Sequence, residues 1–350
     1  MLLFLSIMIS NNAIGQDNKS GIIDTVSICS VWDVSKFDII KQYLNEIGTS
    51  SFLLVTGDST FLSYGNVEIP YNVHSIRKSL LSAIVGQHIG IGPHTINLES
   101  TLEDLGISDY PYPLTRSQQK AKVIHLIKSV SGINHTAAGE FEGWQSEKDN
   151  VMGTMPNEPG TIWAYNNWDY NALTTIFERE SGMTVYEAFK TGLADPLDMH
   201  DFNGESIHYS GDPSLSMHKK AGFFMSARDL AKLGQLYINK GEWEGKQLIP
   251  STWIDRITND FTKTGENGLK NGHGYLWWIP DDSISCKLGI PSGSYFASGF
   301  GRQIIFIIPD WETVIIHQVN TDSYDDCFIE WAKNNQLEIS SLTEASMKIF

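Results

Sequence analysis

The chain has 350 residues, 41% hydrophobic and 19% charged, which is enough for one large two-lobed unit or two ordinary domains with a real core. This composition excludes an intrinsically disordered chain. The formal net charge of -16 argues against nucleic acid and anionic membrane surfaces as main partners. The three cysteines form no Cys-x-x-Cys pair, so no zinc or redox motif is predicted.

Residues 1–15 have the features of an export signal. The apolar run 2–9 is too short to span a bilayer, and the small residues Ala13 and Gly15 are typical of a signal-peptidase site, although no basic residue comes before the run. We therefore expect an exported bacterial protein, periplasmic or extracellular, with residues 16–350 as a single domain. No stable membrane span is predicted.

The N-terminal part of the chain is predicted to combine helices with a strand hairpin. An amphipathic pattern ending in a glycine comes first, then two β-prone runs around a Gly-Asp pair, then a helix with a strongly apolar face. These elements are a helix at 33–48, strands at 51–56 and 60–64, and a helix at 75–88.

The rest of the chain changes from helical to strand patterns near residue 273. Helices are predicted at 118–130, 168–181, 184–193, 226–240 and 250–258, strands at 274–279, 302–308 and 312–319, a turn at Asp310-Trp311 and a last helix at 324–334. Because strands lie at both chain ends, we predict an α+β fold with one antiparallel sheet from about 20–90 and 270–350. An all-helical lobe from about 95–265 is inserted, and the interface between the lobes is a natural ligand site.

Ser-x-x-Lys is a candidate nucleophile motif. It occurs at Ser75/Lys78, Ser117/Lys120 and Ser216/Lys219. Only Ser75 opens an apolar helix, where unpaired N–H groups and the helix dipole favour a developing negative charge. Lys78 lies one turn further on the same helix face. Burial there would lower the pKa of the lysine and favour the neutral amine, which can act as a base. The simpler alternative is a helix cap with a surface lysine.

Tyr-x-Asn is the second candidate motif. It begins at Tyr43, Tyr165 and Tyr237. Only Tyr165 falls in a loop, between Pro-Gly and a predicted helix, and in extended backbone Tyr165 and Asn167 would face one site together. The phenol could shuttle the proton of the serine while the amide of Asn167 holds a substrate carbonyl. A tyrosine packed under a loop is the alternative.

The third candidate is the stretch 294–310, in which small residues and glycines run into an apolar strand. Glycines allow a ligand to approach the strand edge closely, and an N–H of this strand could join the N–H of Ser75 in an oxyanion hole. A hairpin rich in small residues is the alternative. The residues predicted to bind substrate here are Ser298, Gly299, Phe300 and Arg302.

The order of these motifs resembles the serine β-lactamase and penicillin-binding-protein superfamily, in particular the class C β-lactamase-related esterases and amidases. Flanking segments are similar to that family as well, and the resemblance covers about 40–320. These segments are 124–133, 158–167, 196–200 and 224–237.

The resemblance implies a β-lactamase-like fold with Ser75 as nucleophile, Lys78 and Tyr165 as acid/base partners, and Asn167 as a contact to the substrate amide. The third motif departs from the family pattern, because neither Lys-Thr-Gly nor His-x-Gly is present in 297–303. Recognition of a β-lactam carboxylate is therefore in doubt, unless Arg302 supplies a charge.

The sequence predicts a serine hydrolase that acts through an acyl-enzyme on a small ester, amide or peptide, with esters first because they need the least leaving-group activation. D-alanyl-D-alanine carboxypeptidase or β-lactamase activity and a non-catalytic binding or sensing module remain alternatives. No metal or other cofactor is predicted, because no metal-ligand spacing is found.

Overall fold

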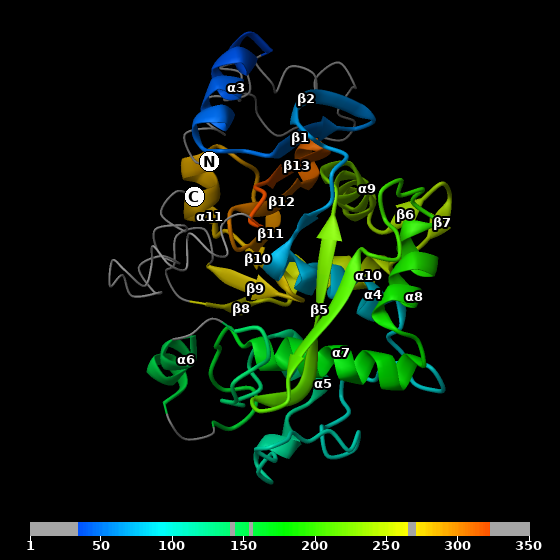
Figure 1. Cartoon of the computed structure of the whole chain (residues 1–350), viewed down its shortest axis with the longest axis vertical. Helices are drawn as coiled ribbons and strands as arrows, with labels where there is room; N and C mark the ends of the chain where they lie inside the picture. Colours follow the sequence, from blue (N-terminus) through cyan, green and yellow to red (C-terminus); the bar gives the residue numbers. More distant parts are fainter. Residues whose placement is uncertain (1–33, 141–143, 154–156, 265–270, 323–350) are drawn as a thin grey trace.

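The computed structural model describes residues 34–140, 144–153, 157–264 and 271–322 (Figure 1). Its main feature is an eight-stranded antiparallel sheet with the order β2-β1-β13-β12-β11-β10-β9-β8. The strands are β1 Ser51–Thr56, β2 Ser59–Gly65, β8 Thr262–Lys263, β9 Gly272–Gly274, β10 Trp277–Ile279, β11 Tyr295–Gly299, β12 Gln303–Ile308 and β13 Thr313–Gln318. The predicted signal peptide 1–15 and last helix 324–334 lie outside the described residues.

The centre of the sheet joins the two ends of the chain. Ser51 of β1 pairs with Gln318 of β13, and the register continues to Thr56 opposite Thr313. Every residue of both strands is buried, because helices cover both faces of the sheet at this point. The predicted antiparallel sheet built from both chain ends is confirmed.

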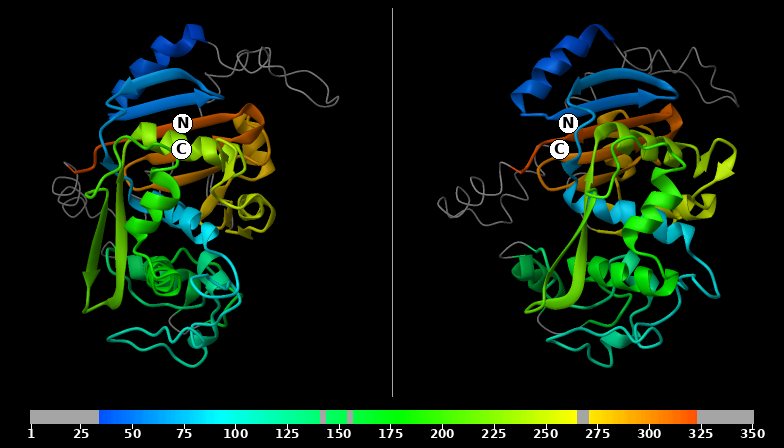
Figure 2. Two further views of the ribbon diagram at one scale, coloured as in Figure 1. Left: turned by 90° about the vertical axis from the view of Figure 1, so that its right-hand side faces the viewer. Right: turned by 45° about the vertical axis from the view of Figure 1, so that its right-hand side comes forward.

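Alternate residues of the central strands belong to different cores. Ile305 and Ile307 of β12 lie in the larger core with α4 (Arg77–Gln87) and α9 (Ala227–Ile238). Ile304, Phe306 and Ile308 lie in the smaller core with Ile40 and Leu44 of α3 (Phe37–Glu46). Successive strand residues point to opposite faces, so each face of the sheet has its own helices (Figure 2).

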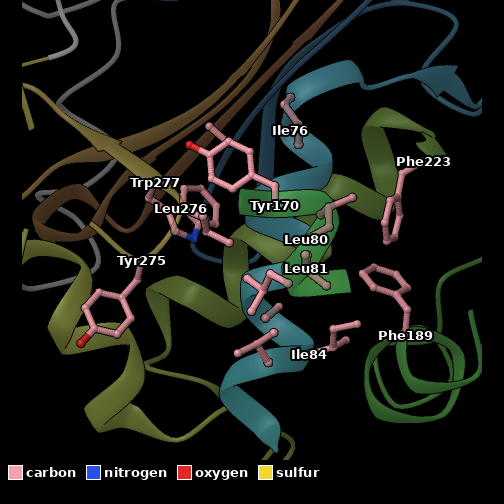
Figure 3. Packing of buried hydrophobic residues seen from close by; sticks show 14 of the residues in the cluster. Ile76, Leu80, Leu81, Ile84, Tyr170, Phe189, Phe223, Tyr275, Leu276 and Trp277 are labelled. Atoms are coloured by element: carbon pink, nitrogen blue, oxygen red, sulfur yellow. The ribbon is translucent and has the colours of Figure 1, made fainter. Parts of the chain in front are cut away.

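Helix α4 runs through the larger core and follows a short 3₁₀ turn, η2 (His74–Ile76). All of its residues except the last are buried, and Figure 3 shows Leu80, Leu81 and Ile84 packed among aromatic side chains of other elements. Gly86 is required here, since a Cβ would come within 2.5 Å of the Trp253 indole. The crowding fixes α4, and with it the start of the helix, in place.

The region from 95 to 265 contains helices, long loops and also strands. Its helices are α5 Val123–Ile127, α6 Trp144–Met152, α7 Asn167–Ser181, α8 Val185–Phe189, the π-turn Lys190–Ala194, α9, and α10 Ser251–Asn259. A second sheet has the order β3-β5-β4, with β3 Tyr71–Asn72, β4 Ile207–Asp212 and β5 Ser216–Met225, while β6 Glu242–Trp243 and β7 Lys246–Gln247 form a small hairpin.

The prediction of an all-helical insertion was therefore wrong in two respects. The β4–β5 hairpin was missed because β5 has no β-branched residue, and its pairing with β4 and packing on α7 hold it extended (Figure 1). In addition, α9 contacts β13, β12 and β1, and α10 contacts β9. These two helices therefore cover the large sheet instead of forming part of a separate helical lobe.

The single strand predicted at 274–279 is a hairpin. Strands β9 and β10 are joined by Tyr275 and Leu276, which have φ values of 51° and 72°. A type I′ two-residue hairpin turn requires positive φ at both positions, and the sequence usually signals this with Asn or Gly.

None of the helices in the described ranges is long and apolar enough to cross a membrane.

Candidate active site

Ser75 lies where the chain turns from strand β3 into η2 and α4. His74, the residue before it, has a φ of 47°, and its N–H donates to Asn72 Oδ1 at 3.0 Å. The His74 ring hydrogen-bonds Thr321 Oγ1 at 2.7 Å and contacts the Phe300 ring edge-on. A histidine in the left-handed region is strained, and these contacts on both sides hold the turn that presents Ser75.

Lys78 lies beneath Ser75 on the same face of the helix. Its Nζ donates to Ser75 Oγ at 2.8 Å, as the spacing of the Ser-x-x-Lys motif predicts. The side chain is 3% exposed, while Ser75 is half-buried and accessible. Lys78 Nζ also lies over the rings of Tyr165 and Tyr170, at 4.5 Å and 4.9 Å from their centroids. The π-faces stabilise a positive charge at this position.

Tyr165 reaches the same nitrogen from the loop before α7. Lys78 Nζ donates to the phenolic oxygen at 2.5 Å, and the Tyr165 ring stacks on Trp278 with centroids 5.6 Å apart. Burial raises the pKa of Tyr165 to about 12, although a hydrogen bond with Ser75 and the charge of Arg77 lower it. The phenol therefore keeps its proton at neutral pH and can donate it. The predicted convergence of Ser75, Lys78 and Tyr165 is present in the structure.

The other copies of the two motifs lie elsewhere. Ser216 is buried in β5 and donates to Asp109 at 2.9 Å, and Ser117 donates to Glu158 at 3.1 Å. Tyr43 lies in α3 and Tyr237 in α9. Only the copies chosen by their local context come together.

Asn167 is the first residue of α7 and is half-buried. Its neighbour Asn166 is buried, accepts a hydrogen bond from Trp168 N at 3.2 Å and donates to Ile133 O at 2.7 Å, so it caps the helix. No hydrogen bond of the Asn167 side chain is found within the described ranges. The amide of Asn167 is therefore available, and its contact with substrate stays a prediction.

The predicted third motif lies beside the serine. Strand β11 contacts η2, and a Cβ on Gly299 would come within 2.3 Å of the carbonyl oxygen of Val73. Only glycine allows this approach, which brings the half-buried end of β11, with Ser298 and Phe300, next to the turn that carries Ser75. The sequence analysis expected the glycines to admit a ligand to this strand edge, and that contact stays a prediction.

Arg302, which was predicted to bind substrate, has a protein partner in the structure, and its contact with substrate stays a prediction. Arg302 lies in the loop between β11 and β12 with a φ of 68°, and its guanidinium donates to the carbonyl of Ile47 at 2.9 Å. Ile47 ends α3, which covers the opposite face of the large sheet from α4. This hydrogen bond supplies a donor to the end of α3, where helix carbonyls lack intrahelical partners.

The sequence did not single out Arg77, the residue between Ser75 and Lys78. Its side chain is 3% exposed and donates to Asn171 Oδ1 at 2.8 Å, and burial lowers its pKa to about 10. Within the described residues it has no carboxylate partner. The signal was a charged residue inside an apolar helix, which becomes informative only when the whole helix is known to be buried.

The described part of the chain holds no group of three or more His, Cys, Asp or Glu side chains arranged to bind a metal ion.

Known proteins share this fold and sequence pattern. The sequence model of the β-lactamase family matches residues 66–337. An uncharacterised protein of Alkalihalophilus pseudofirmus is 26% identical over 72% of this chain and 74% of its own length. The 6-aminohexanoate-dimer hydrolase of Paenarthrobacter ureafaciens is 22% identical over 79% of this chain and 74% of its own length.

Solved structures agree in fold. The octameric penicillin-binding protein homologue from Pyrococcus abyssi has a TM-score of 0.57 at 19% identity and covers 87% of this chain and 77% of its own. A penicillin-binding protein homologue from Caulobacter crescentus has a TM-score of 0.58 at 12% identity and covers 87% of this chain and 94% of its own. With the family match over most of the length, the chain belongs to the β-lactamase family, within the superfamily of serine hydrolases that includes the penicillin-binding proteins.

Proposed function

We propose that the protein is a class C β-lactamase-related hydrolase that cleaves a small ester or amide through an acyl-enzyme on Ser75. The observation that carries this proposal is the continuous contact from Ser75 Oγ to Lys78 Nζ at 2.8 Å and on to the Tyr165 hydroxyl at 2.5 Å. A nucleophile in contact with a base, which is in turn held by a third group, is the arrangement that activates a serine.

The proposed proton route begins with Lys78 as the amine. It takes the proton of Ser75 as Oγ attacks the carbonyl, and the resulting ammonium lies over two aromatic rings that stabilise it. Tyr165, whose pKa is raised to about 12 by burial, is a phenol and gives its proton to the leaving group. Lys78 then returns a proton to Tyr165, and water releases the acyl group by the reverse route.

The oxyanion of the tetrahedral intermediate needs N–H donors. Ser75 lies at the start of a helical segment, where N–H groups have no intrahelical acceptor. The end of β11 at Gly299 and Phe300 lies against the same turn. We propose that the N–H groups of Ser75 and Phe300 form the oxyanion hole.

The substrate class follows from leaving-group chemistry and from the third motif. Esters are the substrates ranked first, because they need the least leaving-group activation. Linear amides are ranked second, because a relative is named a 6-aminohexanoate-dimer hydrolase. β-Lactams and D-alanyl peptides are ranked last, because the stretch 297–303 contains no lysine and the guanidinium of Arg302 hydrogen-bonds Ile47.

The experiment is turnover of p-nitrophenyl acetate and butyrate, together with labelling by a fluorophosphonate probe. The proposal predicts saturable turnover and labelling that both disappear in Ser75→Ala. Labelling that persists in Ser75→Ala would remove the assignment of the nucleophile. Ligand binding without any turnover would instead support a binding module on this fold.

A further inference from the structure

A second lysine lies close to the nucleophile without belonging to any of the motifs. Lys220 is in the middle of β5, three residues before Phe223, whose carbonyl accepts from the N–H of Val73. Strand β5 also contacts α4 and passes beside its start (Figure 1). Three residues of strand span about 10 Å, so the backbone of Lys220 lies within reach of the turn that carries Ser75.

Two glycines make room for the side chain of Lys220. A Cβ on Gly139 would come within 3.0 Å of its Cδ and 3.3 Å of its Nζ, and a Cβ on Gly222 would lie 3.8 Å from its Cε. Gly222 is two residues along the strand on the same face, so the lysine chain bends over it in the direction of β3. The ammonium thus lies against the loop at Gly139.

The electrostatic surroundings agree with this position. Burial lowers the pKa of His74 to about 4, and the charges of Lys220 and Lys78 lower it further, in that order. His74 directly precedes Ser75, so the charge of Lys220 acts on the immediate neighbourhood of the nucleophile. Arg77 adds a third cation that is buried without a carboxylate partner among the described residues.

This concentration of positive charge contrasts with the formal net charge of -16 for the whole chain. A cationic site in an acidic protein selects anionic ligands, since the remaining surface repels them. Lys220 is half-buried, whereas its neighbour Lys219 is exposed. A half-buried ammonium makes stronger contacts than an exposed one, because water screens it less.

We propose that Lys220 binds a carboxylate of the substrate, so that the preferred substrates are esters or amides that carry a carboxylate in addition to the scissile bond. This inference rests on the proposed hydrolase function. It assigns charge recognition to β5. Lys220 is a specificity-determining residue and takes no part in the bond-breaking steps.

The test uses two pairs of esters. Each pair consists of an ester that carries a free carboxylate and the same compound with that carboxylate converted to an uncharged methyl ester. p-Nitrophenyl hydrogen adipate carries the carboxylate on the acyl side, and 3-(4-acetoxyphenyl)propanoate carries it on the leaving side. We expect the wild type to prefer the charged member of at least one pair by about tenfold in kcat/KM, which corresponds to one hydrogen bond to a charged group. Sodium chloride at 0.5 M should reduce the preference.

Variants separate charge recognition from structural effects. Lys220→Gln should abolish the preference, mainly through KM, with the methyl esters changed less than about twofold, and Lys220→Glu should reverse it. Lys219→Gln, the matched control on the same strand, should behave as the wild type. A preference that survives Lys220→Gln, or an equal loss on charged and uncharged esters, would overturn the inference.

The same experiment distinguishes failure of the inference from failure of the proposed function. Turnover that depends on Ser75 but not on substrate charge contradicts only the inference. If no ester is turned over, the role of Lys220 is still tested by calorimetric binding of p-nitrophenyl hydrogen adipate to Ser75→Ala and to Ser75→Ala/Lys220→Gln. At least tenfold weaker binding to the double variant supports the role of Lys220, and equal binding overturns it.

Discussion

The side-chain nitrogen of Lys78 lies 2.5 Å from the phenolic oxygen of Tyr165, although 87 residues separate the two in the chain. The same nitrogen lies 2.8 Å from Ser75 Oγ, so one amine connects a hydroxyl of its own helix with a hydroxyl from the loop before α7. A change at any of the three groups should therefore alter the proton transfer that we propose for this site.

Lys78→Met removes the amine while it keeps most of the volume of the side chain. We expect kcat/KM on p-nitrophenyl butyrate to fall by at least about a thousandfold, since the serine then has no base. The matched control is Lys120→Met in the Ser-x-x-Lys copy at Ser117, which should change activity less than about twofold. Equal effects of the two substitutions would contradict the role of Lys78.

Tyr165→Phe removes one hydroxyl and keeps the ring stacked on Trp278. We expect kcat to fall about 10² to 10⁴-fold, the usual contribution of a positioned acid or base, with little change in KM. Urea unfolding should show a loss of no more than about 1.5 kcal/mol, the worth of one hydrogen bond. Tyr43→Phe, in the copy within α3, is the control, and an unchanged kcat in Tyr165→Phe would exclude the phenol from the reaction.

Gly299→Ala tests the approach of β11 to the serine turn. The new Cβ would come within 2.3 Å of the Val73 carbonyl oxygen, so the strand or the turn must shift. We expect kcat/KM to fall at least about tenfold and stability to fall by about 1–3 kcal/mol. At Gly204 a Cβ meets nothing within 4 Å, so Gly204→Ala should leave both quantities near the wild type. Full activity in Gly299→Ala would remove β11 from the oxyanion hole.

His317 should make the protein less stable in mild acid. Burial lowers its pKa from 6.5 to about 4, while its hydrogen bond to the carbonyl of Arg302 raises it. Between pH 6.5 and 4 the unfolded chain binds a proton that the folded protein excludes. The free energy of unfolding therefore falls as pH decreases through this window, by at most about 1.4 kcal/mol per pH unit for this group.

Urea unfolding of the wild type and His317→Asn at pH 7.0, 5.5 and 4.5 measures this contribution. The variant should lose less stability than the wild type between pH 7.0 and 4.5, whatever its stability at neutral pH. If the free energies of unfolding of the wild type and His317→Asn change in parallel with pH, His317 does not contribute to the pH dependence as its burial requires.

The local sequence pattern was sufficient to predict an element where that element is stabilised mainly by its own residues. The helix at 75–88 and the hairpin around Gly57-Asp58 agree with α4 and β1–β2, because periodicity and turn residues encode them directly. Strand β5 and the β9–β10 turn were not predicted, because pairing and packing partners distant in sequence hold them in conformations that their residues do not favour.

The sequence by itself determined which serine, lysine and tyrosine can act together, because each motif copy was distinguished by the helix or loop around it. Only the tertiary structure decided where the remaining charges act. The guanidinium of Arg302 donates to the end of α3, Arg77 is buried beside Asn171, and the side chain of Lys220 lies against Gly139. The direction of a long side chain depends on the space and partners that other elements provide, and local sequence contains neither.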